Sequence, residues 1–174
     1  IGIVLLSLNL RPGATSLGPV LAEVKAGLGM GGTVAGLITA LPGLCFAVFG
    51  ALAVAISLRL GLTGALAAGV TATAIGLLLR PFVGSVAPFL LLSIVAFAGM
   101  AIGNVLMPAF VKKTFPNRLA GVMSVYTIAL AIGATTASMI AVPLLEAGGP
   151  QGWRVSLGVW GVVAAAAAVV WWAL

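Results

Sequence analysis

The chain has 174 residues, of which 63% are hydrophobic and 6% are charged, and its mean hydropathy is +1.33. A water-soluble domain with so few charges would lack a polar surface, so the composition indicates an integral membrane protein. The net charge of +6 does not point to nucleic-acid binding, because the 8 basic residues are scattered between apolar runs and form no continuous basic face.

Enzyme chemistry has little support in the composition. The chain has no histidine and a single cysteine, Cys45, inside an apolar run, so it predicts neither an internal disulfide nor a zinc or haem site. Its two acids, Glu23 and Glu146, fall at the ends of predicted spans, and no nucleophile has a base beside it. We therefore expect no catalytic residues, no metal and no cofactor.

The first apolar run contains a permanent positive charge. Residues 1–22 would form a helix of roughly 33 Å, long enough to cross a bilayer, with Arg11 near its middle. An arginine at that depth costs about 3 kcal/mol on insertion scales unless it meets water, a partner or a ligand. Pro12 cannot donate a hydrogen bond to the carbonyl of Leu8, so we expect the helix to be loosened beside the charge.

Polar and glycine-rich stretches divide the rest of the chain into five more apolar spans. The six predicted spans are residues 1–22, 33–57, 62–79, 89–111, 119–145 and 153–174. Pro42 lies in the second and Pro108 in the fourth, and we expect both, like Pro12, to break or hinge their helices. Trp153 and Trp171-Trp172, at the two ends of the sixth span, are typical of aromatic belts at membrane interfaces.

The basic residues predict an orientation. The connections after the second and fourth spans hold four basic residues and no acid, namely Arg59, Lys112, Lys113 and Arg118. The other connections hold Lys25, Arg80 and Arg154 together with both acids. Because cytoplasmic loops are enriched in Lys and Arg, we expect the start and the end of the chain on the cytoplasmic side.

The six spans divide into two triplets with matching features. The first and fourth spans each carry an asparagine followed by a proline, Asn9 with Pro12 and Asn104 with Pro108. The second and fifth spans each begin with an Ala-Gly pair. We expect an all-α membrane protein of two inverted three-helix repeats. Proline-interrupted helices at corresponding places point to a transporter's binding site.

The residues expected to form that site lie in the first, fourth and fifth spans. Ser7, Arg11 and Thr15 are spaced four apart, which would place them on one face of the first helix. Arg11 has two interpretations: it lines a central cavity, or it snorkels or pairs with a carbonyl or with a helix outside this chain. Asn104 would bind either a ligand or a neighbouring helix, and Tyr126 would either stack on a substrate or pack between helices.

Several stretches together resemble one transporter family. They are Asn9-Leu10-Arg11-Pro12 with Thr15-Ser16-Leu17-Gly18-Pro19, Ala35-Gly36-Leu37 with Leu41-Pro42, Gly103-Asn104-Val105-Leu106-Met107-Pro108 with Val111-Lys112-Lys113, Tyr126-Thr127, and Gly152-Trp153-Arg154. In this order they resemble the cyanate and 2-nitroimidazole transporter family of the major facilitator superfamily, and the resemblance covers essentially the whole chain. One departure is the connection at residues 57–61, which is shorter and less basic than in that family.

The resemblance implies the N-terminal six-helix half of a twelve-span transporter, covering residues 1–174, in the bacterial cytoplasmic (inner) membrane. Its partners would be the lipid bilayer, a small anionic or polar substrate and a missing C-terminal six-helix half, with no nucleic acid. Transport would proceed by alternating access, with Arg11, Asn9, Asn104, Tyr126 and Thr15 contacting the substrate. The alternative is a non-transporting six-helix scaffold, or a half-transporter that works as a homodimer. The chain opens inside an apolar segment without Met, so we expect a fragment of a longer protein.

Overall fold

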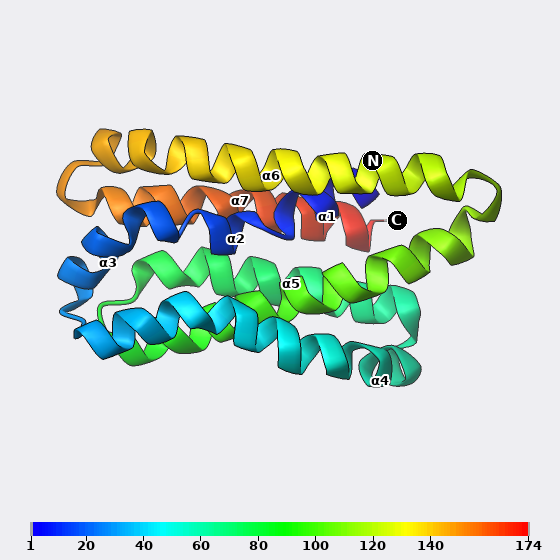
Figure 1. Cartoon of the computed structure of the whole chain (residues 1–174), viewed down its shortest axis with the longest axis horizontal. Helices are drawn as coiled ribbons and strands as arrows, with labels where there is room; N and C mark the ends of the chain where they lie inside the picture. The colour runs from blue at the N-terminus through cyan, green and yellow to red at the C-terminus, as the bar shows by residue number, and fades with distance from the viewer. Residues whose placement is uncertain (1, 174) are drawn as a thin grey trace.

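The structure is a computed structural model that describes residues 2–173, and these form a bundle of helices joined by short turns (Figure 1). In chain order the α-helices are α1 (Gly2–Asn9), α2 (Pro12–Thr15), α3 (Leu21–Leu28), α4 (Gly32–Leu79), α5 (Val86–Thr114), α6 (Leu119–Ala147) and α7 (Gly152–Trp172). Four 3-10 turns link them, namely η1 (Gly18–Val20), η2 (Arg80–Phe82), η3 (Pro116–Arg118) and η4 (Gly149–Gln151).

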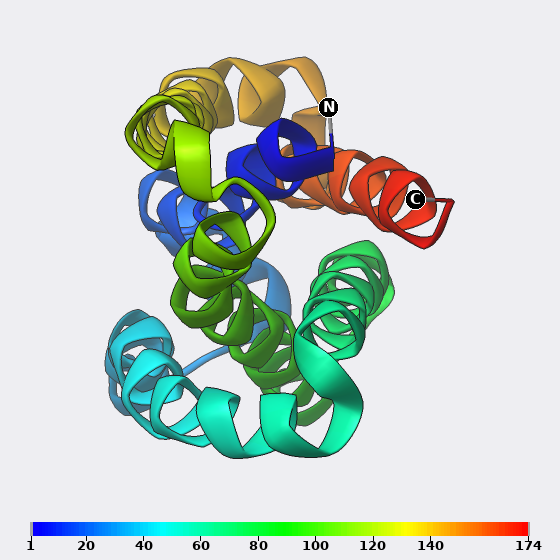
Figure 2. The same cartoon turned by 90° about the vertical axis from the view of Figure 1, so that its right-hand side faces the viewer.

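The bundle makes six crossings. Four helical segments of the described chain are long and apolar enough to cross a membrane: Gly32–Phe82, Val86–Thr114, Pro116–Ala147 and Gly149–Trp172. The first of them has 51 residues, which as one straight helix would be roughly 77 Å, over twice the thickness of a bilayer core. Gly61 breaks it with φ 73° and ψ 161°, so α4 turns back and crosses twice (Figure 2). Helices α1 to α3 together supply the remaining crossing.

Helix α5 is the centre of the bundle. In its most apolar stretch 61% of the residues are buried, compared with 22% in α4 and 28% in α6. Seen from the end in Figure 2, the two halves of α4 lie on different sides of α5, while α1 lies between α6 and α7. The exposed faces of α4 and α6 carry large apolar side chains, as expected for surfaces that meet lipid or another helical body.

Glycines let the second half of α4 cross α5 at close range. A Cβ added to Gly99 would lie 2.3 Å from the Gly69 carbonyl oxygen and 2.8 Å from the Thr73 backbone nitrogen. Gly76 makes a similar approach, because its added Cβ would lie 2.5 Å from the carbonyl oxygen of Leu92. The hydroxyl of Thr73 donates to the carbonyls of Gly69 and Ala96, at 3.0 and 3.4 Å. Small residues therefore bring two backbones together, as is common in membrane bundles.

The structure corrects several details expected from the sequence. The first crossing continues past residue 22 through Glu23 and Lys25 to Leu28, and Gly29 ends it in the left-handed conformation. Trp153 and Trp171 are buried within the bundle, while Trp172 is 69% exposed, so only Trp172 of these three has the exposure expected of an interfacial belt.

Candidate substrate-binding site

The first crossing is broken where Arg11 meets Pro12. Helix α1 ends at Asn9, α2 begins at Pro12, and Arg11 has φ −127° and ψ −32°. Ala14 N–H would bond to the Leu10 carbonyl in a continuous helix, but here it donates to the Arg11 carbonyl at 3.0 Å. The Leu10 carbonyl is therefore free to accept a bond from another helix, as is expected where proline interrupts a membrane helix.

Asn104 of α5 donates a hydrogen bond to this free carbonyl. Its Nδ2 donates to the Leu10 carbonyl at 3.4 Å and to the Met100 carbonyl of its own helix at 2.9 Å. Its Oδ1 accepts a hydrogen bond from the Tyr126 hydroxyl of α6 at 3.5 Å. Asn104 is half-buried and Tyr126 is 5% exposed. One amide thus joins three crossings at the position of the break.

Arg11 lies immediately beyond this bridge, and its side chain is exposed. The structure therefore brings Asn104 and Tyr126 together beside the backbone of Leu10, the residue before Arg11. The region combines a permanent cation, an amide and a phenol hydroxyl in an otherwise apolar bundle. Arg11 can hold an anion or a strongly dipolar solute through charge and hydrogen bonds, whereas the N–H groups of Asn104 and the O–H of Tyr126 already donate within the protein.

Thr15 lies one turn beyond Arg11 and is half-buried. Its hydroxyl donates to the Arg11 carbonyl at 3.2 Å, and its own carbonyl accepts a bond from Ser138 of α6 at 3.5 Å. The predicted stripe of Ser7, Arg11 and Thr15 does not exist as one face. Ser7 is fully buried, whereas Arg11 is exposed, because the break changes the course of the chain between them.

Asn9 is not part of this cluster. It is 1% exposed, and its Nδ2 donates to the Leu5 carbonyl at 2.9 Å and to the Val163 carbonyl of α7 at 3.3 Å. Asn9 and Asn104 use the same local geometry, since each bonds to the carbonyl four residues earlier and to one carbonyl of another helix. The side chain of Asn9 holds α1 against α7.

The three predicted prolines behave differently. Pro12 opens α2 directly after the break. Helices α4 and α5 run through Pro42 and Pro108, and Gly61 is the residue of α4 with non-helical backbone angles. Neither Pro42 nor Pro108 therefore breaks its helix in this structure, and their role as hinges stays a prediction.

A second arginine, missed as a site candidate from the sequence, lies behind the break. Arg80 is fully buried, and its Nη1 and Nη2 donate to the Gly13 carbonyl at 3.3 and 3.4 Å. That carbonyl is free because Leu17 N–H donates to Ala14 instead, at 3.4 Å. The guanidinium also lies 5.7 Å from the centre of the Phe89 ring. Arg80 thus holds the chain two residues beyond Arg11.

Arg154 extends this arrangement. Its Nη1 donates to the Pro81 carbonyl at 2.7 Å, and its guanidinium lies 4.7 Å from the centre of the Trp153 ring. Trp153 in turn meets Phe89 edge to face, with 6.3 Å between the ring centres. The sequence did hold a signal for Arg80, because Leu-Arg-Pro occurs twice, at residues 10–12 and 79–81.

Six antiparallel crossings, with a polar helix break at their centre, are the architecture of one half of a secondary transporter. Residues 3–174 match the Major Facilitator Superfamily, and the chain belongs to this superfamily. The fold agrees with the inward-open structure of the xylose transporter XylE from Escherichia coli, with a TM-score of 0.87 at 14% identity, over 99% of this chain and 47% of that one. The expected fold, an N-terminal half of two inverted three-helix repeats, is confirmed.

Curated relatives are named as transporters. The chain is 38% identical over 171 residues to the uncharacterized transporter YycB of Bacillus subtilis, covering 98% of this chain and 42% of that protein. It is 30% identical to the 2-nitroimidazole transporter of Escherichia coli, covering 90% and 39%, and 30% identical to the cyanate transport protein CynX of the same organism, covering 97% and 44%. The resemblance stated from the sequence is therefore confirmed, and the chain spans less than half the length of these relatives.

Proposed function

We propose that this chain is the solute-binding N-terminal half of a secondary active transporter for a small anionic or polar solute. The observation that supports the proposal is the bridge from Asn104 to the Leu10 carbonyl and to Tyr126, since Leu10 directly precedes the exposed Arg11. A second six-helix half would complete the site, and the two halves would rock about it in alternating access.

Each residue has a proposed role. Arg11 supplies the fixed positive charge, and its planar guanidinium can form two parallel hydrogen bonds to an anion. Asn104 and Tyr126 orient the solute by accepting hydrogen bonds from it or by stacking, and Thr15 borders the site. We leave Asn9 out of the proposed contacts because it is buried against α7. The named solutes of two relatives, cyanate and 2-nitroimidazole, are small and polar, which supports this solute class.

The test uses the full-length protein that contains this chain, reconstituted in vesicles, with cyanate and 2-nitroimidazole as probes in a screen of small anions and azoles. We expect Arg11→Gln to abolish most of the uptake and most of the thermal stabilisation by any solute that binds. Arg11→Lys is expected to be damaging as well, because an ammonium group cannot reproduce two parallel hydrogen bonds.

Arg59→Gln is the matched control, since it removes the same charge from an exposed residue in the turn between the halves of α4. Uptake and solute-induced stabilisation that stay normal in Arg11→Gln would show that Arg11 does not bind the solute. If the full-length protein bound none of the probes, the proposed class of solute would be wrong.

A further inference from the structure

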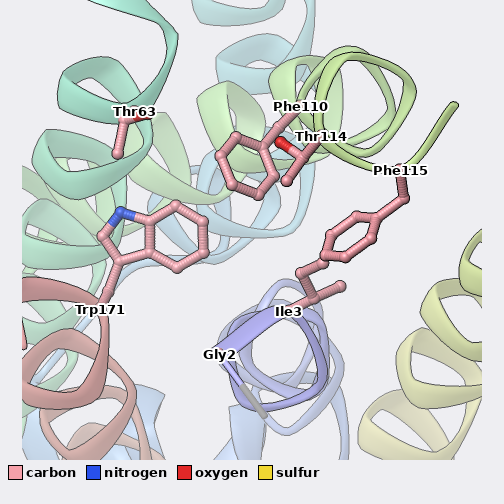
Figure 3. Close-up of a pocket in the computed structure, with 7 residues that line it drawn as sticks. All are labelled: Gly2, Ile3, Thr63, Phe110, Thr114, Phe115 and Trp171. Atoms are coloured by element: carbon pink, nitrogen blue, oxygen red, sulfur yellow. The ribbon is translucent and has the colours of Figure 1, made fainter. Parts of the chain in front are cut away.

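A cavity of about 450 Å³ opens beside the start of α1 and the end of α7 (Figure 3). It is lined by Gly2, Ile3, Thr63, Phe110, Thr114, Phe115 and Trp171, which come from α1, α4, α5, α7 and the residue after α5. An adjoining cavity of about 420 Å³ shares Thr63, Phe110 and Thr114 and adds Lys113. Both volumes fall in the range of small-molecule sites in proteins.

One side of the first cavity is apolar and aromatic. Phe110 and Trp171 lie with their ring centres 5.3 Å apart and their planes inclined at 58°. Figure 3 shows Phe115 and Ile3 across the opening from these two rings. Phe115 is 37% exposed in a turn between two crossings, so it adds apolar surface at the rim. Such a wall suits a hydrocarbon chain.

The other side offers hydrogen-bond donors without matching acceptors. Trp171 is 7% exposed, and its Nε1 is buried without a hydrogen-bond partner among residues 2–173. Figure 3 shows this nitrogen on the side of the ring that faces Thr63. Thr63 and Thr114 line both cavities. A buried N–H without an acceptor is costly, and a ligand oxygen that reached this nitrogen would satisfy it.

The charge around the two cavities is positive. Lys113 lines the second cavity, and Lys112 and Arg118 are exposed close by in the chain. The two acids, Glu23 and Glu146, belong to α3 and to the far end of α6, at the opposite end of the bundle (Figure 1). Basic pockets between membrane helices match the phosphate groups of anionic lipids.

We propose that these two cavities form one binding site for an anionic phospholipid. The lipid phosphate lies against Lys113 and the hydroxyls of Thr63 and Thr114, and an acyl chain lies along Ile3, Phe110 and Trp171. The described lining residues do not include the residues of the proposed solute site. Through one ligand it joins the first, third, fourth and sixth crossings at the end where all four begin or finish.

The experiment measures lipid binding to the full-length protein without solute. Delipidated protein is titrated with phosphatidylglycerol or phosphatidylcholine in detergent, and the melting temperature and the lipids retained in native mass spectrometry are recorded. We expect phosphatidylglycerol to raise the melting temperature and to remain bound, and phosphatidylcholine to do neither. Lys113→Gln is expected to lose at least half of the shift, whereas Lys25→Gln, the same change on an exposed lysine at the opposite end, keeps it.

Two further variants test the lining of the cavity and the N–H donor of Trp171. Thr63→Leu fills the cavity and removes a hydroxyl, and Trp171→Phe keeps an aromatic ring but removes the N–H; each is expected to weaken retention of phosphatidylglycerol. Equal shifts in Lys113→Gln and Lys25→Gln would overturn the proposal, as would equal binding of both lipids. Stabilisation by soluble glycerol 3-phosphate to the same extent would also overturn it, because the occupant would then be a free phosphate. Arg11→Gln is expected to retain the lipid, which separates this site from the solute site.

Discussion

Arg80 and Gly13 are 67 positions apart in the chain, yet both terminal nitrogens of the arginine, Nη1 and Nη2, bond to the glycine carbonyl. The guanidinium replaces the backbone donor that the turn between α2 and η1 takes away. It does so from a fully buried position, and its Nε has no hydrogen-bond partner among the described residues. The end of the third crossing thereby fixes the backbone beside Arg11.

Two substitutions of Arg80 are predicted to separate the cost of its buried charge from the stabilisation by its hydrogen bonds to Gly13. Arg80→Lys keeps a buried charge but loses the paired donors and much of the contact with Phe89, so the cost of burying the charge remains without its compensation. Arg80→Met removes that cost and leaves the Gly13 carbonyl unpaired, at about 1–3 kcal/mol. We therefore expect the lysine variant to unfold at a lower temperature than the methionine variant, measured by thermal unfolding in detergent.

Both Arg80 variants are expected to transport more slowly than the parent, because Gly13 lies two residues beyond Arg11. Arg118→Lys and Arg118→Met provide the matched pair at an exposed arginine and are expected to differ little in either measurement. If Arg80→Met were the less stable of the two Arg80 variants, the hydrogen bonds to Gly13 would outweigh the cost of the buried charge.

Asn104 and Tyr126 are predicted to differ in what they contribute. Asn104→Ala leaves the Leu10 carbonyl without its partner, and we expect a loss of about 1 kcal/mol in the free energy of unfolding. Tyr126→Phe removes a hydroxyl whose bond to Asn104 is long, at 3.5 Å, so we expect a loss below about 0.5 kcal/mol. Tyr126→Phe is expected to weaken solute binding more than it lowers stability. A solute titration measures the first quantity and an unfolding titration measures the second. If Tyr126→Phe lost as much stability as Asn104→Ala, the Tyr126 hydroxyl would act mainly in stabilising the fold and not in binding the solute.

Asn9 is predicted to act in packing. Asn9→Ala removes a buried side chain and the two hydrogen bonds that its amide donates, one to a carbonyl of α1 and one to a carbonyl of α7, so we expect the free energy of unfolding to fall by about 1–2 kcal/mol. Solute affinity in the folded fraction is expected to stay within a factor of about two, since about 0.4 kcal/mol corresponds to that factor. A tenfold loss of solute affinity without a change in stability would show that Asn9 does contribute to solute binding.

The crossing at Gly99 is predicted to tolerate no added carbon. The Cβ of Gly99→Ala would meet backbone atoms of Gly69 and Thr73, which cannot swing away, and we expect a loss of about 1–3 kcal/mol. Gly158→Ala is the control, because its Cβ would lie 3.5 Å from the Pro81 ring, an ordinary contact. The helix preference of alanine over glycine, about 1 kcal/mol, would then leave that variant unchanged or more stable. SDS or thermal unfolding of the two variants compares them directly.

The sequence predicted the six-crossing fold well because membrane spans are set by long apolar runs and short polar breaks. The break at Pro12 was also predictable, since it follows from a missing N–H at one residue. Pro42 and Pro108 show the limit of that inference. A proline alone does not decide whether its helix bends, because neighbouring helices can hold the helix in place.

Side-chain directions were less predictable. Asn9 and Asn104 look equivalent in sequence, but Asn9 faces α7 and Asn104 faces the break. Arg80 looked like a loop residue at the end of a span, although it is the more deeply buried of the two Arg-Pro arginines. These differences depend on which helices are neighbours. The local spacing of residues does not predict contacts between residues that are 94 or 67 positions apart.

The broken first crossing also has a consequence for biosynthesis. Its Leu10 carbonyl acquires a partner only when Asn104, 94 residues later, has been synthesised and inserted, and its Gly13 carbonyl must wait for Arg80. Until then this segment carries a charge and two unpaired carbonyls at membrane depth, which makes it a poor independent membrane anchor. Of the six crossings described here, the one synthesised before the other five is therefore among the last to be completed in the membrane.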